Sequence, residues 1–438
     1  MDNLVPKAYK DYGLYINEYR SFPLLQDGLK PVERRILYSC YQIARDKFVK
    51  SVRVDGFVLG HFHPHSLSYG SIVQLVNQGF LEGQGSFGTN VGVEPCGPAA
   101  SRYTECKLSK KTADMAFRLI DYVDMIESEL DDEPEFIPTL FPFCLMGEKF
   151  TSGMGLGYST LIPCYKIEDL YKRLLFLLKI TDKEPIIKPI SDCTILSSND
   201  ELKNLLVKGK QKIQVKSVYK IENERSRIIM KSKLPPGKTF ISLLEQINKH
   251  FNQDIGFSDL SSTDTNIVFE VLRQRGKTDI FNAFIKFFDI QVTGNISFEN
   301  NVFDRKISKV ICVSVDDMLL NTYKYYSKIN EKMLNESILK INEVMKELKI
   351  LEIIRPSLAT HVSKSTNAEE TIEKIHQDTK IEKDIISKLL SKYRISKLLS
   401  LTTDTSELEK DQKDLQEKLN SIDKYVLGNY DEFMKTKY

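Results

Sequence analysis

The residues best suited to chemistry occupy one short segment, Ala99-Ala100-Ser101-Arg102-Tyr103-Thr104-Glu105. Its small residues leave room around the side chains of Arg102 and Tyr103. A tyrosine hydroxyl, with a pKa of about 10, is a weak nucleophile unless cations stabilise its phenolate or the charge that develops on a phosphorus centre. The neighbouring guanidinium offers fixed donors that match phosphate oxygens. Because an isolated Arg-Tyr pair is usually structural, this interpretation depends on the residues that accompany it.

Three histidines, His61, His63 and His65, alternate along the chain, with Pro64 between the last two. In an extended segment this alternation predicts three imidazoles on one face. A metal site is one interpretation, but no cysteine or clear carboxylate partner lies nearby in the sequence. Imidazoles at the start of a helix are better suited to phosphate contact. Histidine also titrates near neutral pH, so the pair could assist proton transfer.

The surrounding sequence predicts two short helices with a turn between them, which resembles a helix-turn-helix unit. Asp27-Gly28 marks a turn, and Pro31 suits the first turn of a helix. The second helix is expected after His65. Each helix is predicted from apolar residues at helical spacing. These are Val32, Ile36, Cys40 and Ile43 in the first helix, and Ile72, Val73 and Val76 in the second.

Basic residues crowd the first helix and the segment after it, against only Glu33 and Asp46. This cluster is either a surface for an anionic partner or an ordinary solvated face. A later segment, Gly83-Gln84-Gly85-Ser86-Phe87-Gly88, has three glycines in six positions, which lets a backbone approach another group closely but also fits a surface turn. The basic cluster comprises Lys30, Arg34, Arg35, Arg45, Lys47, Lys50 and Arg53.

A second region, about 166–315, alternates short strands with helices. Period-two alternation at Ile213, Val215, Tyr219 and Ile221 predicts a half-buried strand. A return strand through Ile228 and Met230 is expected after a turn at 222–226. A lysine row on the first strand either protects a sheet edge or follows a phosphate backbone. The row consists of Lys208, Lys210, Lys212, Lys216 and Lys220.

The last region, about 316–438, is rich in Lys, Glu, Leu and Ile and is predicted to be helical. Two four-three apolar patterns predict an antiparallel pair of long helices around a helical knot near 356–402. Ser406 and Glu409 form a candidate capping box, and Gly428 a candidate helix end. The patterns are Leu334, Ile338, Ile341, Met345 and Leu348, then Leu408, Leu415, Leu419, Ile422 and Val426. Apolar residues of the knot either form its own core or contact a second copy; they are Ile385, Ile386, Leu389, Leu390, Ile395, Leu398 and Leu399.

Composition excludes several classes of protein. The 438 residues carry a net charge of +2, with 41% hydrophobic and 28% charged residues, as in ordinary globular proteins. Seven scattered cysteines without a CxxC pair indicate neither a disulfide framework nor a zinc knuckle, and favour a reducing cytosol. No apolar run approaches a membrane span. The sequence lacks a GxxxxGK phosphate loop, HExxH and GxSxG, so ATP or a divalent ion would have to come through another chain.

Four ordered motifs resemble the breakage-reunion subunit of type II DNA topoisomerases, the gyrase A subunit family. They are Asp27-Gly28-Leu29-Lys30-Pro31-Val32-Glu33-Arg34-Arg35, His63-Pro64-His65, the segment Gly83–Gly88 and Arg102-Tyr103-Thr104-Glu105. Ser152-Gly153-Met154-Gly155-Leu156-Gly157 continues the match. The total length, with no tail after the last long helix, is most similar to the medium subunit of the T-even bacteriophage topoisomerase. The resemblance implies an α+β multidomain fold: a winged-helix domain at 1–165, an α/β tower domain at 166–315, and at 316–438 a long antiparallel coiled coil with a helical globule at a dimer gate.

The resemblance also implies roles for particular residues. Tyr103 would attack a DNA phosphate and hold the 5′ end as a phosphotyrosyl ester, while Arg102 would stabilise the transition-state charge. Arg20, His63 and His65 occupy positions of phosphate-binding and catalytic helpers. Met154 stands where the family usually has an isoleucine that wedges between base pairs, and Ser68 falls on the serine that contacts quinolones in gyrase. The expected DNA-binding residues are Lys30, Arg34, Arg35, Arg53, Ser68, Met154, Lys212, Lys216 and Lys220.

The partners follow from the same resemblance. The chain would bind double-stranded DNA as a homodimer joined at its C-terminal gate, and would hold no cofactor alone. Mg2+ and ATP would be supplied through partner subunits that carry the magnesium site and the ATPase. On this resemblance the chain would lack the gyrase wrapping domain, so relaxation rather than negative supercoiling is expected. It would work in the cytoplasm, that of the host cell if a phage encodes it. A dimeric DNA-binding or scaffold protein without enzymatic activity is the alternative.

Overall fold

The structure is a computed structural model that describes residues 4–65, 67–88, 96–128, 130–148, 150–222, 227–230, 234–251, 267–270, 278–361, 368–393, 398 and 404–436. The chain divides into two compact units, Met1–Tyr326 together with Phe433–Tyr438, and Ser327–Glu432. The regions predicted at 1–165 and 166–315 both lie in the first unit. Within the described ranges, no helix has both the length and the apolar composition that a bilayer span requires.

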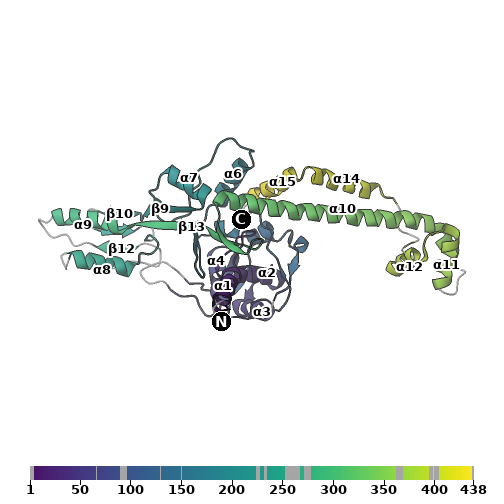
Figure 1. The fold of residues 1–438 in the computed structure, drawn as a ribbon, viewed down its shortest axis with the longest axis horizontal. Helices are drawn as coiled ribbons and strands as arrows, with labels where there is room; N and C mark the ends of the chain where they lie inside the picture. Colours follow the sequence, from purple (N-terminus) through teal and green to yellow (C-terminus); the bar gives the residue numbers. More distant parts are fainter. Residues whose placement is uncertain are drawn as a thin grey trace. The chain divides into compact units, whose positions relative to one another are not determined.

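The first unit begins with helices α1 (Leu4–Ile16), α2 (Pro31–Ile43), α3 (Ser51–His61) and α4 (Tyr69–Asn77), and a short π-helix, η1 (Asn17–Ser21), follows α1 (Figure 1). The predictions of α2 and α4 are confirmed, and Ile36, Cys40 and Ile72 are fully buried. Helix α3 was not expected, because Gly56 and Gly60 have low helix propensity and interrupt its apolar pattern. Since α3 continues to His61, the expectation that three histidines share one strand face is wrong.

A tight turn sets the start of α2. Gly28 has φ +74°, and a Cβ there would lie 2.8 Å from the Cys144 nitrogen, so only glycine fits. The Lys30 N–H donates to the Glu33 carboxylate at 2.9 Å and caps the first turn. Burial raises the pKa of Glu33, although the nearby Lys30 opposes that shift. The turn predicted at Asp27-Gly28 and the helix start predicted at Pro31 are therefore confirmed.

A small antiparallel sheet anchors the segment that contains Tyr103. Its strand order is β1 (Val49–Lys50), β3 (Glu105–Leu108), β2 (Leu81–Gln84), and β3 begins two residues after Tyr103. Gly85, just past β2, has φ +100°, and a Cβ there would lie 3.2 Å from the Tyr103 carbonyl oxygen. The glycine-rich segment thus approaches another backbone closely. Short elements complete this part: α5 (Lys110–Ala116), η2 (Ile120–Tyr122), β4 (Met125–Ile126), β5 (Glu133–Pro134) and η3 (Phe143–Leu145).

A five-stranded antiparallel sheet follows, in the order β6 (Thr151–Met154), β7 (Ser159–Ile162), β13 (Thr293–Glu299), β9 (Lys210–Lys216), β8 (Thr194–Ile195). Helix α7 (Asn199–Lys208) packs on it through Leu202 and Leu205 (Figure 1). The sequence predicted one strand through Ile213, Val215, Tyr219 and Ile221, extended back to Lys208. Instead, Lys208 ends α7, β9 ends at Lys216, and a separate strand in another sheet begins at Tyr219. Gly209 caps that helix in the left-handed region, where a side chain would clash with the Val313 carbonyl. Helix α6 spans Ile167–Leu177, and β14 (Asn301–Asp304) pairs with β15 (Lys309–Cys312).

A third antiparallel sheet has the order β10 (Tyr219–Glu222), β11 (Arg227–Met230), β12 (Ile267–Glu270). Helices α8 (Phe240–Phe251) and α9 (Thr278–Gln291) cover it, and Ile228, Met230 and Phe284 share one buried cluster. The predicted return strand through Ile228 and Met230 is confirmed by its pairing with β10. The turn at 223–226 lies outside the described residues. Helices combined with separate antiparallel sheets agree with the predicted α+β class.

The second unit is helical. It contains most of α10 (Val315–His361), followed by α11 (Ala368–Thr379), α12 (Lys383–Lys392), α14 (Ser406–Asn420) and most of α15 (Ile422–Lys435). Gln412 donates to Asn342 at 2.7 Å and Asn429 to Asn330 at 3.3 Å, so α10 runs antiparallel to α14 and α15, and α14 lies along α10 in Figure 1. The structure shows an antiparallel pair of helices in one chain. The predictions of a coiled coil and of a dimer gate stay untested.

Details of the second unit differ from the sequence pattern. Thr405, not Ser406, precedes the first turn of α14, and its hydroxyl donates to Glu409 at 3.1 Å. Gly428 does not end a helix but lies inside α15. In the knot, Ile386, Leu389 and Leu398 pack into a core with α10 residues, which supports a self-contained knot for these three. Ile395 and Leu399 lie outside the described residues.

Candidate active site and nucleic-acid interface

Tyr103 stands on an exposed turn with its aromatic ring accessible to solvent. Its side chain is 64% exposed, and the guanidinium carbon of Arg102 lies 4.6 Å from the ring centroid. Within the described part of the chain, no hydrogen bond to the Tyr103 hydroxyl is seen. A cation therefore lies against the ring while the phenol oxygen remains accessible to a ligand. This is the arrangement that a tyrosine nucleophile with an adjacent phosphate-binding group requires.

A network of partly and fully buried hydroxyl groups holds this turn in place. The Tyr69 hydroxyl donates to the Ala99 carbonyl at 2.6 Å and lies 3.0 Å from the Thr104 hydroxyl. Thr104, which is fully buried, donates to the Ser51 hydroxyl at 2.8 Å. The Ser51 N–H in turn donates to the Thr104 carbonyl at 3.0 Å. The starts of α3 and α4 thus fix both ends of the segment that contains Tyr103.

A second cluster is built around His63, which is 8% exposed. Arg35 lies 3.0 Å from its Nδ1 and makes two bonds to Glu133, at 2.7 and 2.9 Å. Because a guanidinium can only donate, Nδ1 accepts, and the neutral ring carries its proton on Nε2. The His65 ring lies edge-on to His63 with centroids 5.4 Å apart, and Tyr15 is 3.3 Å from His65 Nε2. The two histidines predicted as helpers are therefore brought together.

His61 does not join this cluster. Its Nδ1 pairs with Asp131, and its ring stacks on Phe57 with centroids 4.1 Å apart. Among the residues that the structure describes, no three His, Cys, Asp or Glu side chains are grouped as metal ligands. The three-histidine metal interpretation is therefore not supported by the geometry of these side chains. The structure describes all seven cysteines, and none of them forms a disulfide.

Three residues predicted to contact DNA are instead buried in the protein. Arg34 is 2% exposed and makes two bonds to Asp27, at 2.7 and 2.9 Å. Arg35 is 6% exposed and is engaged by Glu133 and His63, as described above. Ser68 is 3% exposed, and its N–H and hydroxyl both donate to Asp55, at 2.6 and 2.8 Å. We correct these three assignments from direct DNA contact to internal support.

The other predicted contacts lie at the surface. Arg20 in η1 and Arg53 in α3 are exposed, and Met154 is 84% exposed at the end of β6. Lys30 is partly buried and donates to the Ser152 carbonyl at 2.6 Å. These positions leave the side chains accessible to a large anionic partner.

The lysine row is only partly available for such a partner. Lys212 and Lys220 are exposed. Lys216 pairs with Asp289 at 2.7 Å, and Tyr219 also donates to that carboxylate at 2.5 Å. Burial alone would raise the pKa of Asp289, but the hydrogen bonds from Lys216 and Tyr219 lower it overall. Lys216 is therefore held by the protein itself.

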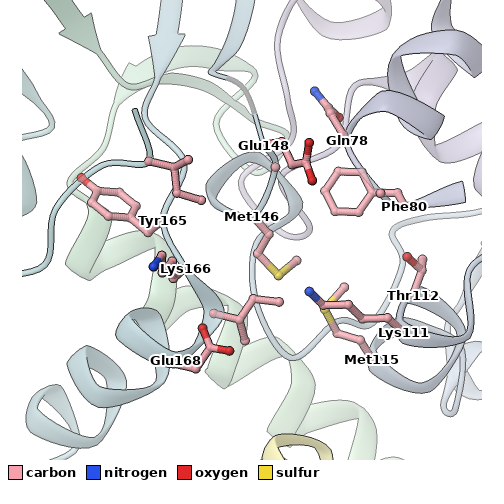
Figure 2. A pocket seen from close by; sticks show the side chains of 14 residues that line it. Gln78, Phe80, Lys111, Thr112, Met115, Met146, Glu148, Tyr165, Lys166 and Glu168 are labelled. Carbon is pink, nitrogen blue, oxygen red and sulfur yellow. The ribbon is translucent and has the colours of Figure 1, made fainter. Parts of the chain in front are cut away.

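Two of the cavities lined by described residues lie in the first unit. One, of about 260 Å³, has the apolar side chains Phe80, Met115 and Met146, with Lys111 and Glu168 at its sides (Figure 2). None of the predicted site residues lines it. The other, of about 240 Å³, is lined by polar groups that include Lys30 and the backbone segment around Ser152. Lys30, one of the predicted DNA-binding residues, thus lines this second cavity.

Sequence reasoning missed Tyr69 and Glu133. Tyr69 looks like an ordinary aromatic at the start of a helix, and Glu133 lies in an acidic stretch 98 positions from Arg35. Neither residue has a local sequence signal, because its role exists only through contacts between distant segments. Both support a site residue rather than present a group to a ligand.

A comparison of the sequence with known protein families identifies the class of protein to which this fold and these side-chain clusters belong. Residues 20–437 match the family model that describes the A subunits of DNA gyrase and topoisomerase IV. The match covers most of the chain, so the protein belongs to this family of type II topoisomerase A subunits.

Individual relatives agree with the family. The chain is 27% identical over 427 residues to the DNA gyrase A subunit of Borreliella burgdorferi. This match covers 91% of the present chain and 50% of the relative. It is 26% identical over 460 residues to the DNA gyrase A subunit of Chlamydia pneumoniae, covering 97% and 53%. It is 32% identical over 268 residues to the DNA topoisomerase 4 A subunit of Haemophilus influenzae, covering 55% and 35%. The chain therefore spans about half the length, or less, of these curated relatives.

Proposed function

We propose that this chain is the DNA-cleaving and religating subunit of an ATP-dependent type II DNA topoisomerase. One observation carries the proposal: the accessible Tyr103 phenol, with Arg102 against its ring, on a turn that buried hydroxyls fix in place. Membership in the gyrase and topoisomerase IV A-subunit family supports it. The His63–His65 pair supplies further phosphate-binding groups in the same unit.

The proposed reaction is a reversible transesterification. The Tyr103 hydroxyl loses its proton as its oxygen bonds to phosphorus, the phosphorus–O3′ bond breaks, and O3′ takes up a proton to leave as the 3′ hydroxyl. The 5′ phosphate stays bonded to Tyr103, so the diester free energy is kept and resealing reverses the same step. Arg102 would stabilise charge on the phosphate oxygens, with Arg20, His63 and His65 as further phosphate-binding groups. Two copies of the chain would cut opposite strands, and a second duplex would pass through the break.

Partner chains complete the proposal. As the family resemblance implies, a partner subunit would hold the magnesium ion and would also bring the ATPase. Magnesium would supply charge stabilisation at the phosphate. A homodimer closed at the C-terminal gate, relaxation rather than negative supercoiling, and the likeness to the T-even bacteriophage medium subunit remain parts of this proposal.

The direct test is to trap the covalent intermediate. The full chain is mixed with a magnesium-binding topoisomerase partner and plasmid, and the reaction is stopped with detergent. We expect double-strand breaks whose 5′ ends remain linked to this chain through phosphotyrosine. DNA binding without any protein-linked ends would instead favour the non-enzymatic DNA-binding or scaffold protein.

The hydroxyl network gives a first mutational prediction. Tyr69→Phe removes the donor to the Ala99 carbonyl and the contact with Thr104, so the turn is held less firmly. Such hydrogen bonds contribute about 1 kcal/mol each, so we expect the loss of one to two of them to slow single-turnover cleavage roughly fivefold to thirtyfold. Affinity for duplex DNA should not change, because this hydroxyl faces the protein. A cleavage rate equal to that of the unmodified chain would show that the network does not position Tyr103.

The lysine row gives a second prediction. Replacing an exposed phosphate contact by a neutral residue lowers the slope of log K against log salt by about 0.9 unit. We expect this loss for Lys212→Gln and a clearly smaller one for Lys216→Gln, because Lys216 is paired with Asp289. The measurement is duplex affinity over a range of salt concentrations. An unchanged slope for Lys212→Gln would favour protection of the sheet edge.

A further inference from the structure

The hairpin that presents Met154 has an unusual tip. Met154 ends β6 opposite Ser159 of β7, and the Gly155 N–H donates to the Tyr158 carbonyl at 3.0 Å to close the turn. Met154 lies between Gly153 and Gly155 and is 84% exposed. A large apolar side chain is therefore held away from the protein on a tight turn. How firmly Met154 is held against a ligand depends on which residues hold that turn in place.

Asn17 fixes it. This residue is 4% exposed at the start of the π-helix η1, and 139 positions separate it from Leu156. Its Nδ2 donates to the Leu156 carbonyl at 3.2 Å, and its Oδ1 accepts from the Leu156 N–H at 3.0 Å. One carboxamide thus satisfies both backbone groups of one residue, as a neighbouring strand would.

The glycines on both sides of Met154 make this docking possible. A Cβ at position 155 would clash with the Asn17 Oδ1 and with the Phe22 ring. A Cβ at position 153 would clash with the Ser21 carbonyl oxygen. The hairpin therefore lies directly against this segment, with Gly153 at the Ser21 backbone and Gly155 at the side chains of Asn17 and Phe22. Met154, between them, is the side chain that this close contact turns outward.

The same π-helix contains Arg20. Asn17 and Arg20 lie three residues apart in a five-residue element, and Arg20 is exposed. π-Helical turns are uncommon and frequently occur at functional sites. The Asn17 carboxamide consequently joins the hairpin with Met154 and the segment with Arg20 into one local piece. A shift of one would shift the other.

We propose that Asn17 is a positioning residue that holds the Met154 hairpin against η1, so that Met154 can insert between base pairs of a bound duplex and bend it. The inference rests on the proposed function, because that function supplies the duplex. An apolar wedge bends DNA only if its backbone support resists the force of the stacked bases. The two hydrogen bonds to Leu156 and the close glycine contacts provide that support.

The test measures DNA bending without cleavage. A short duplex with a dye at each end is bound by the full chain carrying Tyr103→Phe, together with its magnesium-binding partner, and energy transfer reports the bend. We expect Asn17→Ala to lower the bent-to-straight ratio on the order of tenfold, as for the loss of one to two hydrogen bonds, and Met154→Ala to lower it at least as much. Asn17→Asp keeps the acceptor for Leu156 but loses the donor, so an intermediate bend is expected.

A double substitution separates positioning from general damage. If Asn17 acts through Met154, Asn17→Ala adds little in a Met154→Ala background, whereas independent effects would add. Asn342→Ala, which removes a single side-chain hydrogen bond in the second unit, is the matched control and should bend DNA normally. The proposal is overturned if Asn17→Ala or Met154→Ala bends DNA like the unmodified residue, or if the double variant shows additive losses. If the chain with its native Tyr103 formed no protein-linked ends, this result would contradict the proposed cleavage function alone. The bending assay does not depend on cleavage, because it uses the Tyr103→Phe chain.

Discussion

Tyr103→Phe is expected to abolish covalent capture of DNA while leaving duplex affinity nearly unchanged. The substitution removes one oxygen from a side chain that is 64% exposed, so neither packing nor the turn should change. The ring also keeps its contact with Arg102. Removing a nucleophile that no neighbour replaces lowers the rate by roughly 10⁴-fold or more. Detergent-stopped reactions should therefore show no protein-linked 5′ ends, and filter binding should show an unchanged Kd.

A matched control is Tyr9→Phe, which removes a hydroxyl from another tyrosine of similar exposure, 66%. This variant should cleave DNA at the rate of the unmodified chain. Covalent adducts that persist in Tyr103→Phe would assign the nucleophile to another residue. Loss of adducts together with loss of binding would instead mean that the hydroxyl contributes to the DNA interface. The two assays on the two variants thus separate chemistry from binding.

Local sequence signals were sufficient where one short segment fixes the structure. The Asp27-Gly28 turn, Pro31 and the apolar spacing correctly predicted where α2 begins and that Ile36 and Cys40 are buried, because these features act within one or two turns of chain. The turn that carries Arg102 and Tyr103 was recognised by residue types that stay next to each other in any fold. Its role in cleavage stays a prediction.

Local sequence patterns could not predict the burial of side chains whose partners lie in other segments. Arg34, Arg35 and Ser68 look like surface groups in the sequence, yet each meets a buried carboxylate that lies 7 to 98 positions away. A basic residue near the start of a helix is usually solvated, so nothing local marks these as buried. Their partners became visible only when the fold brought Asp55 and Glu133 against them.

Helix boundaries explain two other differences. His61 belongs to α3 because Val54 and Val58 are both buried one turn apart, which extends the helix past two glycines. Lys208 belongs to α7 because the left-handed Gly209 ends that helix one residue later. In both cases an apparent period of two crossed the end of a helix. Alternation over three or four residues could not distinguish these arrangements.

Arg34→Met is expected to destabilise the first unit strongly, because it leaves a buried charge without its counterion. The Asp27 carboxylate is fully buried and accepts four hydrogen bonds: two from Arg34, one from the Leu29 N–H at 2.9 Å and one from the Ile137 N–H at 3.0 Å. Burial alone would disfavour the charged guanidinium, but Asp27 more than offsets this and the pKa of Arg34 is raised. Removing one partner of such a pair costs about 3–5 kcal/mol.

Urea unfolding of the full chain, followed by a signal from the first unit, measures this loss. Arg53→Met is the matched control, since it makes the same change at an exposed position and should alter stability by no more than about 0.5 kcal/mol. The two variants should behave in opposite ways toward DNA: Arg53→Met should lower the salt slope of binding, whereas Arg34→Met, studied well below its unfolding midpoint, should not. Adding Asp27→Asn to Arg34→Met removes the unpaired charge but keeps an acceptor for Leu29 and Ile137, so it should restore part of the stability. If Arg34→Met proved stable and its salt slope fell, the guanidinium would contact phosphate after all, and the burial of this pair would have to open when DNA binds.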